Sequence, residues 1–143
     1  MIWISYAMFT VLQAVALIHL GWAFGMAWPA KSRVLLRPMV VGTPKHVQMP
    51  PAALTVFVSV VISVIGFMAL WGVEQFSLMA LDGFRPAPIL LASFVFFVRG
   101  VATYLPFGML TKSVEPFRTL DRSYFAPLCL LLSLGYFLMY RLL

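Results

Sequence analysis

Arg99 is the residue whose chemistry fits its surroundings least. Thirteen uncharged residues precede it, beginning at Pro86, and twelve follow it, beginning at Gly100. A guanidinium keeps its charge in a protein, and at the centre of a bilayer it costs about 3 kcal/mol on insertion scales. No Asp or Glu occurs within the apolar stretches of the chain. We therefore expect Arg99 to lack an acidic partner at its own depth in this chain.

Four kinds of partner could stabilise the Arg99 guanidinium instead. The first is a shell of neutral acceptors: Gln13, Ser63, Ser133 and the Ala102 carbonyl, which loses its helical donor because residue 106 is proline. The others are a bound anion or lipid phosphate, a carboxylate from a second protein, and a water-filled cavity. Ionisable residues inside membranes often mark functional sites, so the structural and the ligand-binding alternatives both stay open.

His19 is the second residue that could carry chemistry. With Trp22 and Met26 it forms a stripe at helical spacing. A haem in a helical bundle usually takes two axial ligands, but His46, the only other histidine, lies in a loop. We therefore expect no haem and no other cofactor. An interior histidine with satisfied hydrogen bonds is the favoured interpretation, and a proton-handling role beside Arg99 is the second.

The chain shows no constellation of residues typical of an enzyme. It has no carboxylate pair in an apolar stretch, no P-loop, no nucleophile elbow and no His/Glu cluster with metal-ligand spacing. Its single cysteine, Cys129, excludes an internal disulfide and is more typical of packing than of a reactive thiol. The favoured interpretation is therefore a non-enzymatic protein with no catalytic residues and no metal site, and an enzyme that acts on a lipid or quinone stays open as the third alternative.

The elements that must position these residues are membrane helices. Hydrophobic residues make up 63% of the 143 residues and charged residues 10%, whereas charged residues make up about 25% of a soluble domain. A bilayer-spanning helix needs about 20 apolar residues, and four stretches meet this length: about 2–27, 52–72, 88–110 and 124–142. We predict one all-α domain over residues 1–143, an integral membrane four-helix bundle.

The connections between the predicted helices contain helix breakers and polar residues. The first, from Pro29 to Pro51, contains five prolines, which favours an extended loop over a long helix. The second contains the apolar run FSLMAL, which suggests a short interfacial helix. In the third, either Asp121 or Ser123 is expected to begin the last helix, with Pro127 in its first turn.

Membrane topology explains the net charge of +6. Seven basic residues lie in the first and third connections: Lys31, Arg33, Arg37, Lys45, Lys112, Arg118 and Arg122. Only Arg85 and Arg141 fall on the opposite side. The positive-inside rule then predicts that both termini face away from the cytoplasm. The lipid bilayer accounts for these charges, so no nucleic-acid partner is expected.

Combining this topology with the helical rise places polar residues of the four stretches at similar depths. Gln13, Ser63, Arg99 and Ser133 fall near the midplane, and His19, Thr103 and Tyr104 lie somewhat toward the cytoplasm. We predict that they form an interior site for a small anionic or amphiphilic ligand or a lipid headgroup. The alternative is an accessory or assembly subunit of a larger membrane complex, with Arg99 or the Gly21/Gly25 face contacting a partner helix.

Two stretches of the sequence resemble a known family. The first is LIHLGWAFGMAWP, from Leu17 to Pro29, and the second runs from VRGVATYLPF to FRTLDRSYFAPLCLLL, between Val98 and Leu132. The first resembles an Ile-His-x-x-Trp-Ala-x-Gly signature. The second resembles the Arg-Gly…Tyr and Phe-x-x-Leu-Asp-x-x-Tyr-(Ser/Ala)-Pro-Leu-Cys pattern of short bacterial four-helix membrane proteins grouped as domain of unknown function 3995. The resemblance implies a bacterial inner-membrane location and four helices, and it implies no activity.

The resemblance also points to particular positions of this chain. The motif positions are His19, Trp22, Arg99, Tyr104, Asp121, Tyr124, Pro127 and Cys129. Phe125-Ala126 departs from the Tyr-Ser expected before Pro127, which weakens a role for a hydroxyl group at that place.

Overall fold

A computed structural model describes residues 2–44, 48–75, 78–105 and 113–143. Within these residues the chain is helical and contains no strand, so the predicted all-α class is confirmed. The long helices are α1 (Ile2–Ala23), α3 (Ala52–Gly72), α4 (Pro86–Ala102) and α6 (Ala126–Leu142). Shorter elements connect them: α2 (Arg33–Val40), the 3-10 helix η1 (Met79–Phe84), α5 (Phe117–Leu120) and the π-helical turn η3 (Asp121–Phe125).

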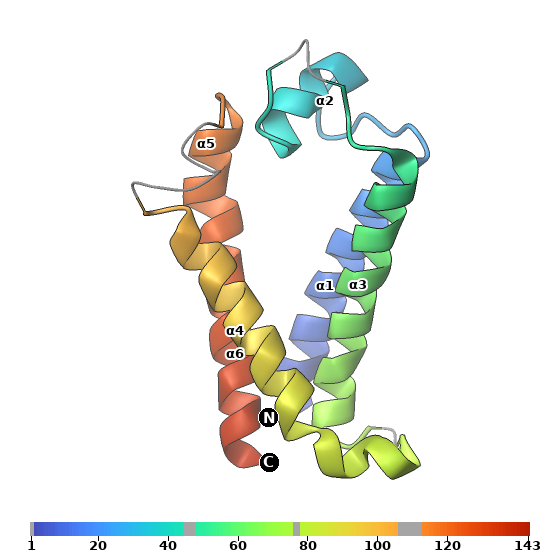
Figure 1. Cartoon of the computed structure of the whole chain (residues 1–143), viewed down its shortest axis with the longest axis vertical. Helices are drawn as coiled ribbons and strands as arrows, with labels where there is room; N and C mark the ends of the chain where they lie inside the picture. The colour runs from blue at the N-terminus through green and yellow to red at the C-terminus, as the bar shows by residue number, and fades with distance from the viewer. Residues whose placement is uncertain (1, 45–47, 76–77, 106–112) are drawn as a thin grey trace.

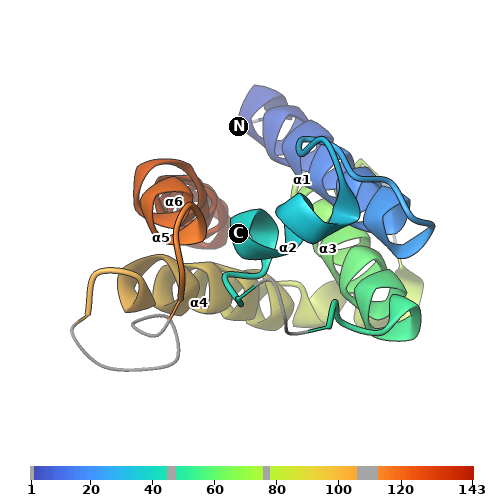
Figure 2. The same ribbon diagram turned by 90° about the horizontal axis from the view of Figure 1, so that it is seen from above.

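The long helices form two antiparallel pairs, α1 with α3 and α4 with α6 (Figure 1). The pairs meet at the end of the molecule where both chain termini lie, which we call the closed end. They diverge toward the opposite, open end, where α2 lies between them (Figures 1 and 2). The predicted four-helix bundle is therefore not confirmed as one continuous bundle.

Among the residues that the structure describes, three helical segments are long and apolar enough to cross a membrane, which indicates a membrane protein. They are Ile2–Ala23, Ala52–Gly72 and the continuous run Phe117–Leu142. Helix α4 is apolar but has 17 residues, about 25 Å of helix, and so is shorter than the predicted stretch 88–110. It ends at Ala102 because proline at position 106 has no N–H for the Ala102 carbonyl. Residues 106–110 of that prediction lie outside the described residues.

Helix α1 ends at Ala23 rather than at the predicted residue 27. Gly25 has a φ of 101°, and the Met26 N–H donates to the Gly21 carbonyl over 2.9 Å. A glycine in the left-handed region with such a bond is a common helix terminus.

The α1/α3 seam is held by polar side chains that bond across it. The Ser59 hydroxyl donates to the carbonyl of Ala16 over 2.7 Å, and the Ser5 hydroxyl donates to the carbonyl of Ala69. Hydrogen bonds between membrane helices contribute about 0.6 kcal/mol each on average. The pair is therefore stabilised by several modest contacts in addition to packing.

The α4/α6 seam combines a serine pair with a close backbone approach. Ser93 donates its hydroxyl to the Ser133 carbonyl over 2.9 Å, and Ser133 donates to the Ser93 carbonyl over 2.8 Å. At Gly100, a Cβ would lie 2.7 Å from the Leu130 side chain and 3.1 Å from the Ala126 carbonyl oxygen. Only glycine allows the helices to approach this closely there.

The hydrophobic core lies at the closed end and joins the two pairs. Its buried members come from all four long helices: Met8, Leu12, Ala69, Ile89, Ala92, Leu132, Tyr136 and Met139. Tyr136 is fully buried, and its hydroxyl donates to the Ile65 carbonyl of the other pair over 2.5 Å. Phe96 stacks on the Tyr136 ring with centroids 6.0 Å apart.

The first connection contains a helix, so the extended loop predicted there is wrong over residues 33–40. Ser32 caps α2, because its hydroxyl oxygen accepts from the Leu35 N–H over 3.4 Å. Leu36 is fully buried, and this burial favours a helix despite the nearby prolines. After α2, the carbonyl of Gly42 accepts from the Val114 N–H over 2.9 Å, which joins this connection to the segment before α5.

The second connection contains η1, in agreement with the short helix predicted there; residues 76 and 77 lie outside the described residues. Asp82 accepts from the Trp71 indole N–H over 2.7 Å. Arg85 forms ion pairs with Glu74 at 2.6 Å and with Asp82 at 3.1 Å. The hydrogen bond to Glu74 is the main reason that the pKa of Arg85 is raised above its ordinary value.

Candidate functional site

Arg99 has an acidic partner within the chain. Its Nη2 donates to Asp121 Oδ1 over 2.5 Å, and its Nη1 donates to Thr103 Oγ1 over 2.9 Å. The Thr103 hydroxyl donates in turn to Asp121 Oδ2 over 2.6 Å. The expectation that Arg99 has no acidic partner at its own depth is therefore wrong. We call Arg99, Thr103 and Asp121 the ionic triad.

The local helix geometry explains why Asp121 reaches Arg99. The last helical run begins at Phe117, so neither Asp121 nor Ser123 begins it as predicted. Pro127 has no N–H to continue the α-helical ladder, and the Ala126 N–H donates to the Asp121 carbonyl across a π-helical turn. Within that turn the Asp121 side chain is only 2% exposed. A residue expected to be a helix cap is thus a buried ion-pair partner.

The depth predicted for Arg99 also needs correction. Arg99 lies in the last turn of α4 rather than in the middle of a span. The reason is the early end of α4 at Ala102. A cation in a last turn is favoured by the helix dipole, and near a helix end a long basic side chain can reach the membrane interface. The guanidinium is therefore less costly at this position than at the bilayer centre.

The ion pair leaves part of the hydrogen-bonding capacity of Arg99 available. A guanidinium has five N–H donors, and contacts within the described residues use two of them. The Arg99 side chain is 35% exposed, whereas both Asp121 oxygens accept hydrogen bonds. Arg99 is thus a partly exposed donor that a buried carboxylate orients, an arrangement suited to phosphate, carboxylate or hydroxyl oxygens.

Three other predicted site residues bond across helix seams. Ser63 donates its hydroxyl to Gln13 Oε1 over 2.7 Å, and Gln13 Nε2 donates to the Ser63 carbonyl over 3.1 Å. Ser133 is paired with Ser93 on the other seam. The structure therefore brings Gln13 and Ser63 together, but it does not place either of them or Ser133 in the ionic triad.

Tyr104 lies next to the ionic triad along α4 and its C-terminal turn. Its hydroxyl donates to the Arg122 carbonyl over 2.9 Å, which ties the end of α4 to η3. The side chain is half-exposed. Tyr104 therefore supports the position of η3 beside α4.

His19 makes its contacts within α1. Its Nδ1 lies 2.8 Å from the Val15 carbonyl oxygen, and its ring centroid lies 4.9 Å from that of Trp22. Because a carbonyl oxygen can only accept, Nδ1 is the donor in this contact. Within the described residues, no group of three or more His, Cys, Asp or Glu side chains could hold a metal ion.

The core-facing sides of α4 and α6 continue beyond the core into the open end. On α4, Phe96 packs against the core, and Arg99 follows one turn later on the same face. On α6, Cys129 lies seven residues before Tyr136, which places the two on one face of the helix. Cys129 is partly buried. The faces of α4 and α6 that form the core at the closed end therefore carry Arg99 and Cys129 nearer the open end, where the two pairs separate.

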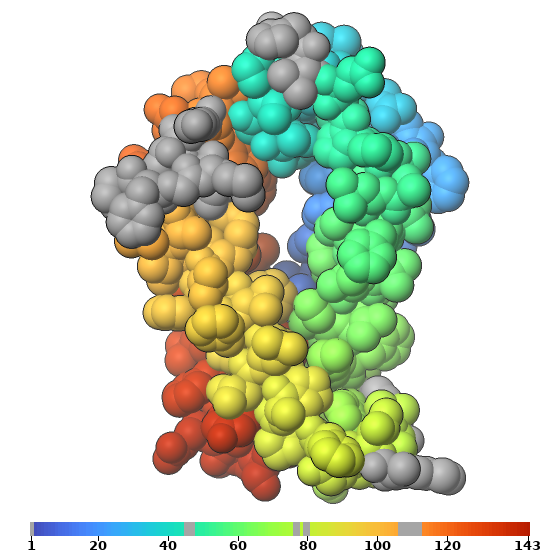
Figure 3. Space-filling model, viewed as in Figure 1, coloured from blue at the N-terminus to red at the C-terminus, as the bar shows by residue number. Residues whose placement is uncertain are grey.

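Helix α1 follows the same pattern from the opposite side. Met8 belongs to the core, and its sulfur would lie 2.5 Å from a Cβ on Gly135 of the other pair. His19 lies eleven residues after Met8, which is about three helical turns and returns to the same face. Figure 3 shows an open hollow between the two pairs below α2. We call this space the hollow, and helical spacing directs His19 toward it from α1.

The Gly21/Gly25 pair, the second contact surface considered for a partner helix, is not a helix face. Gly25 lies beyond the end of α1. A Cβ on Gly21 would lie 2.6 Å from the methyl carbon of Met26, so the chain itself covers this glycine. The prediction that both glycines share an open helix face is wrong, because the glycines terminate α1.

Asp121 is the site residue whose role sequence reasoning missed. Its position in an apparently polar connection suggested a helix cap, and the π-helical turn that buries it has no sequence signature apart from Pro127. The signal that could have found it is the family motif itself, which contains both Arg99 and Asp121.

Comparison with known protein families gives a match over most of the chain. A family model described as "Protein of unknown function (DUF3995)" matches residues 12–136, most of the chain. No curated protein and no solved structure matches the chain. The matched region includes the whole ionic triad, His19 and Cys129.

Proposed function

The chain belongs to the DUF3995 family, and we propose that it is a multi-pass protein of a bacterial inner membrane that binds an amphiphile without converting it. The polar part of the amphiphile contacts Arg99 and His19 in the hollow, and its apolar part extends toward the bilayer between the helix pairs. The observation that carries this proposal is the partly exposed, incompletely used guanidinium of Arg99 on a face that otherwise forms the core.

The membrane topology in this proposal uses all four long helices as spans. Helices α1, α3 and the run Phe117–Leu142 have the required length and composition. Helix α4 is an apolar helix of about 25 Å that pairs with α6 along its length, so it crosses most of the same layer. The basic residues Lys31, Arg33 and Arg37 lie at the open end. The positive-inside rule favours a cytoplasmic open end and periplasmic termini.

The chemistry of the ionic triad favours a ligand that offers oxygen acceptors. Asp121 already balances the charge of Arg99, so no anion is required for neutrality. The free N–H groups of Arg99 suit a phosphate, carboxylate or hydroxyl group, and a long basic side chain near the end of α4 can reach toward the headgroup layer. An unfilled gap between apolar helices is unfavourable, and lipid chains are the material available to fill it.

Cys129 provides a direct test of binding in the hollow because it is the single cysteine of the chain. The purified protein in maltoside micelles is alkylated with N-ethylmaleimide, with and without a single-chain lysophosphatidylglycerol as the probe. We expect the probe to slow alkylation several-fold in the wild type. The double variant Arg99→Gln/Asp121→Asn removes the ion pair without leaving a charge and should lose this protection.

The matched control is Arg141→Gln, which removes one exposed positive charge at the closed end and should keep the protection. A thiol that reacts at the same rate with and without the probe would contradict the proposal. So would purification in mild detergent as a stoichiometric complex with another membrane protein and no bound lipid, because that result favours an accessory subunit.

A further inference from the structure

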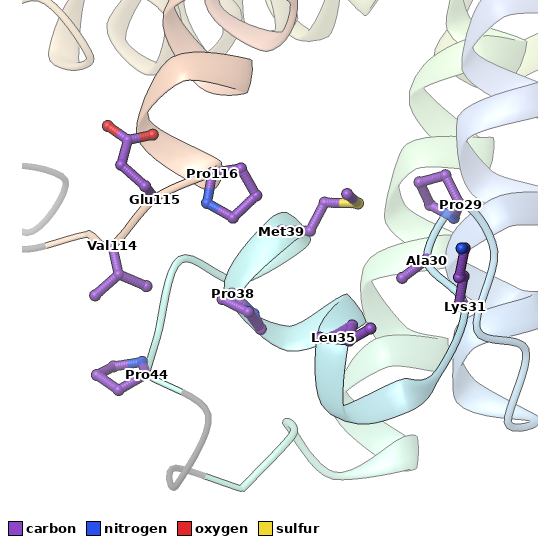
Figure 4. A pocket seen from close by; sticks show the side chains of 10 residues that line it. All are labelled: Pro29, Ala30, Lys31, Leu35, Pro38, Met39, Pro44, Val114, Glu115 and Pro116. Atoms are coloured by element: carbon purple, nitrogen blue, oxygen red, sulfur yellow. The ribbon is translucent and has the colours of Figure 1, made fainter.

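A second cavity of about 690 Å³ lies at the open end, between α2 and the segment that leads into α5 (Figure 4). We call it the α2 pocket. Leu35, Pro38 and Met39 line it from α2, and Val114 and Pro116 line it from the other segment. Its volume is within the range of about 300–1,000 Å³ that is usual for ligand pockets. The lining by apolar side chains favours an apolar group as one part of its ligand.

Two charged residues, Lys31 and Glu115, also line the α2 pocket, but only one of them is available. Glu115 Oε2 accepts from the Thr119 N–H over 3.2 Å and from its hydroxyl over 2.9 Å. In Figure 4 the Glu115 carboxylate points away from α2. Lys31 has no hydrogen-bond or ion-pair partner in the part of the chain that the structure describes, and it is exposed. The pocket therefore offers one free positive charge beside an apolar surface.

The walls of the α2 pocket are fixed to both helix pairs. Arg33 Nη2 donates to the Trp22 carbonyl at the end of α1 over 3.5 Å. The Val114 N–H donates to the Gly42 carbonyl over 2.9 Å. Contacts at both ends of α2 therefore hold the pocket open between the pairs rather than leaving α2 free on the surface.

We propose that the α2 pocket is a second binding site, specific for an anionic phospholipid. Lys31 contacts the phosphate, and Leu35 and Met39 contact the first carbons of an acyl chain. This site goes beyond the amphiphile site in the hollow, because it uses none of the residues of the ionic triad. Charge complementarity favours an anionic over a zwitterionic lipid, since the one free charge of the pocket is positive and Glu115 is engaged elsewhere.

A lipid fits this pocket better than a free phosphate ion does. A single exposed lysine is strongly hydrated and gives little affinity for an ion in water. The apolar lining adds affinity only if the ligand brings an apolar part. The open end faces the headgroup layer in the topology proposed above, so phospholipid is the ligand present at the highest local concentration.

The experiment titrates the purified full chain in maltoside micelles with dioleoyl phosphatidylglycerol and counts bound lipid by native mass spectrometry. Lys31→Gln should weaken phosphatidylglycerol binding by about fivefold, the effect of one lysine near a lipid headgroup. Lys31→Arg should retain the affinity, and Arg141→Gln should leave it unchanged. Dioleoyl phosphatidylcholine should bind the wild type about as weakly as phosphatidylglycerol binds Lys31→Gln.

A second variant tests the apolar part of the site without changing charge. Leu35→Trp fills the pocket from its wall and should reduce phosphatidylglycerol binding while leaving the alkylation protection of Cys129 intact. Conversely, Arg99→Gln/Asp121→Asn should retain the Lys31-dependent binding, which separates failure of the α2 pocket from failure of the site in the hollow. Equal affinity of Lys31→Gln and wild type, equal binding of the two phospholipids, or displacement of the lipid by millimolar inorganic phosphate would overturn the proposal.

Discussion

The closed and open ends of this molecule are joined by different kinds of contact. At the closed end, side chains from all four long helices pack around Tyr136, and its hydroxyl bonds to the carbonyl of Ile65 in the other pair. At the open end, polar contacts such as Arg99–Asp121 remain within one pair, and α2 connects the pairs through Gly42 and its other contacts. Hydrogen bonds and ion pairs between side chains therefore hold the two helices of each pair together. The two pairs are joined mainly by the core at the closed end, so they are separated at the open end, where a ligand site can form.

The largest loss of stability is expected at the closed end. Tyr136→Ala removes a fully buried aromatic side chain and should lower the free energy of unfolding by about 4 kcal/mol. Chemical denaturation in detergent micelles measures this loss. Phe94→Ala is the control, because Phe94 is 61% exposed on α4 and should cost far less. Equal losses in the two variants would mean that the closed end is not the point where the pairs are joined.

The next largest effect concerns the ionic triad. Asp121→Ala leaves Arg99 without its carboxylate and should destabilise the protein by about 3 kcal/mol, the lower limit for a broken buried pair, because Arg99 is 35% exposed. Arg99→Leu/Asp121→Ala removes both charges and should recover most of this loss in the same unfolding assay. The two residues do not interact if the loss of stability in the double variant equals the sum of the losses in Asp121→Ala and Arg99→Leu.

A smaller effect is expected on the α1/α3 seam. Gln13→Leu removes both hydrogen bonds to Ser63 and should lower the free energy of unfolding by about 1 kcal/mol. Ser63→Ala removes only the bond from the Ser63 hydroxyl, because the other bond uses the Ser63 main-chain carbonyl. Its loss should therefore be smaller than that of Gln13→Leu and non-additive with it. Additive losses would mean that the two side chains stabilise the pair independently and not through their mutual contact.

The orientation of the two ends can be tested with almost no effect on stability. In a Cys129→Ala background, Lys31→Cys places a thiol at the open end and Arg141→Cys places one at the closed end. A membrane-impermeant maleimide added to intact cells should label only the Arg141→Cys variant, because the basic open end is expected to face the cytoplasm. Labelling of Lys31→Cys from outside would reverse the proposed topology.

The apolar composition was sufficient to predict the helices but not where they end. The stretches expected at 2–27 and 88–110 both end earlier, at Ala23 and Ala102. In each case local backbone chemistry decides: a glycine in the left-handed region ends α1, and a proline that lacks an N–H follows α4. Hydropathy measures only how apolar a stretch is. Its value therefore stays high beyond the end of a helix when the following side chains are also apolar.

The candidate site was predicted only in part. Arg99 and Thr103 share a helix face, and their contact could be expected from their spacing of four residues. The contact with Asp121 could not, because it depends on a π-helical turn and on the pairing of α4 with α6. The residues of the predicted polar layer are divided between the two pairs for a related reason: similar depth does not place Gln13 and Ser133 side by side when they belong to different pairs.

The pairing pattern has a consequence for how the protein is made. Each pair consists of long helices that are consecutive along the chain, α1 with α3 and α4 with α6. The polar side chains Ser59 and Gln13 find their partners within the first hairpin, so this hairpin can leave the ribosome and enter the bilayer before the second hairpin is synthesised. The second hairpin carries its own charge neutralisation in Arg99 and Asp121. Biogenesis is then expected to consist of two separate insertions, after which the pairs dock around Tyr136 at the closed end and through the Gly42–Val114 contact at the open end.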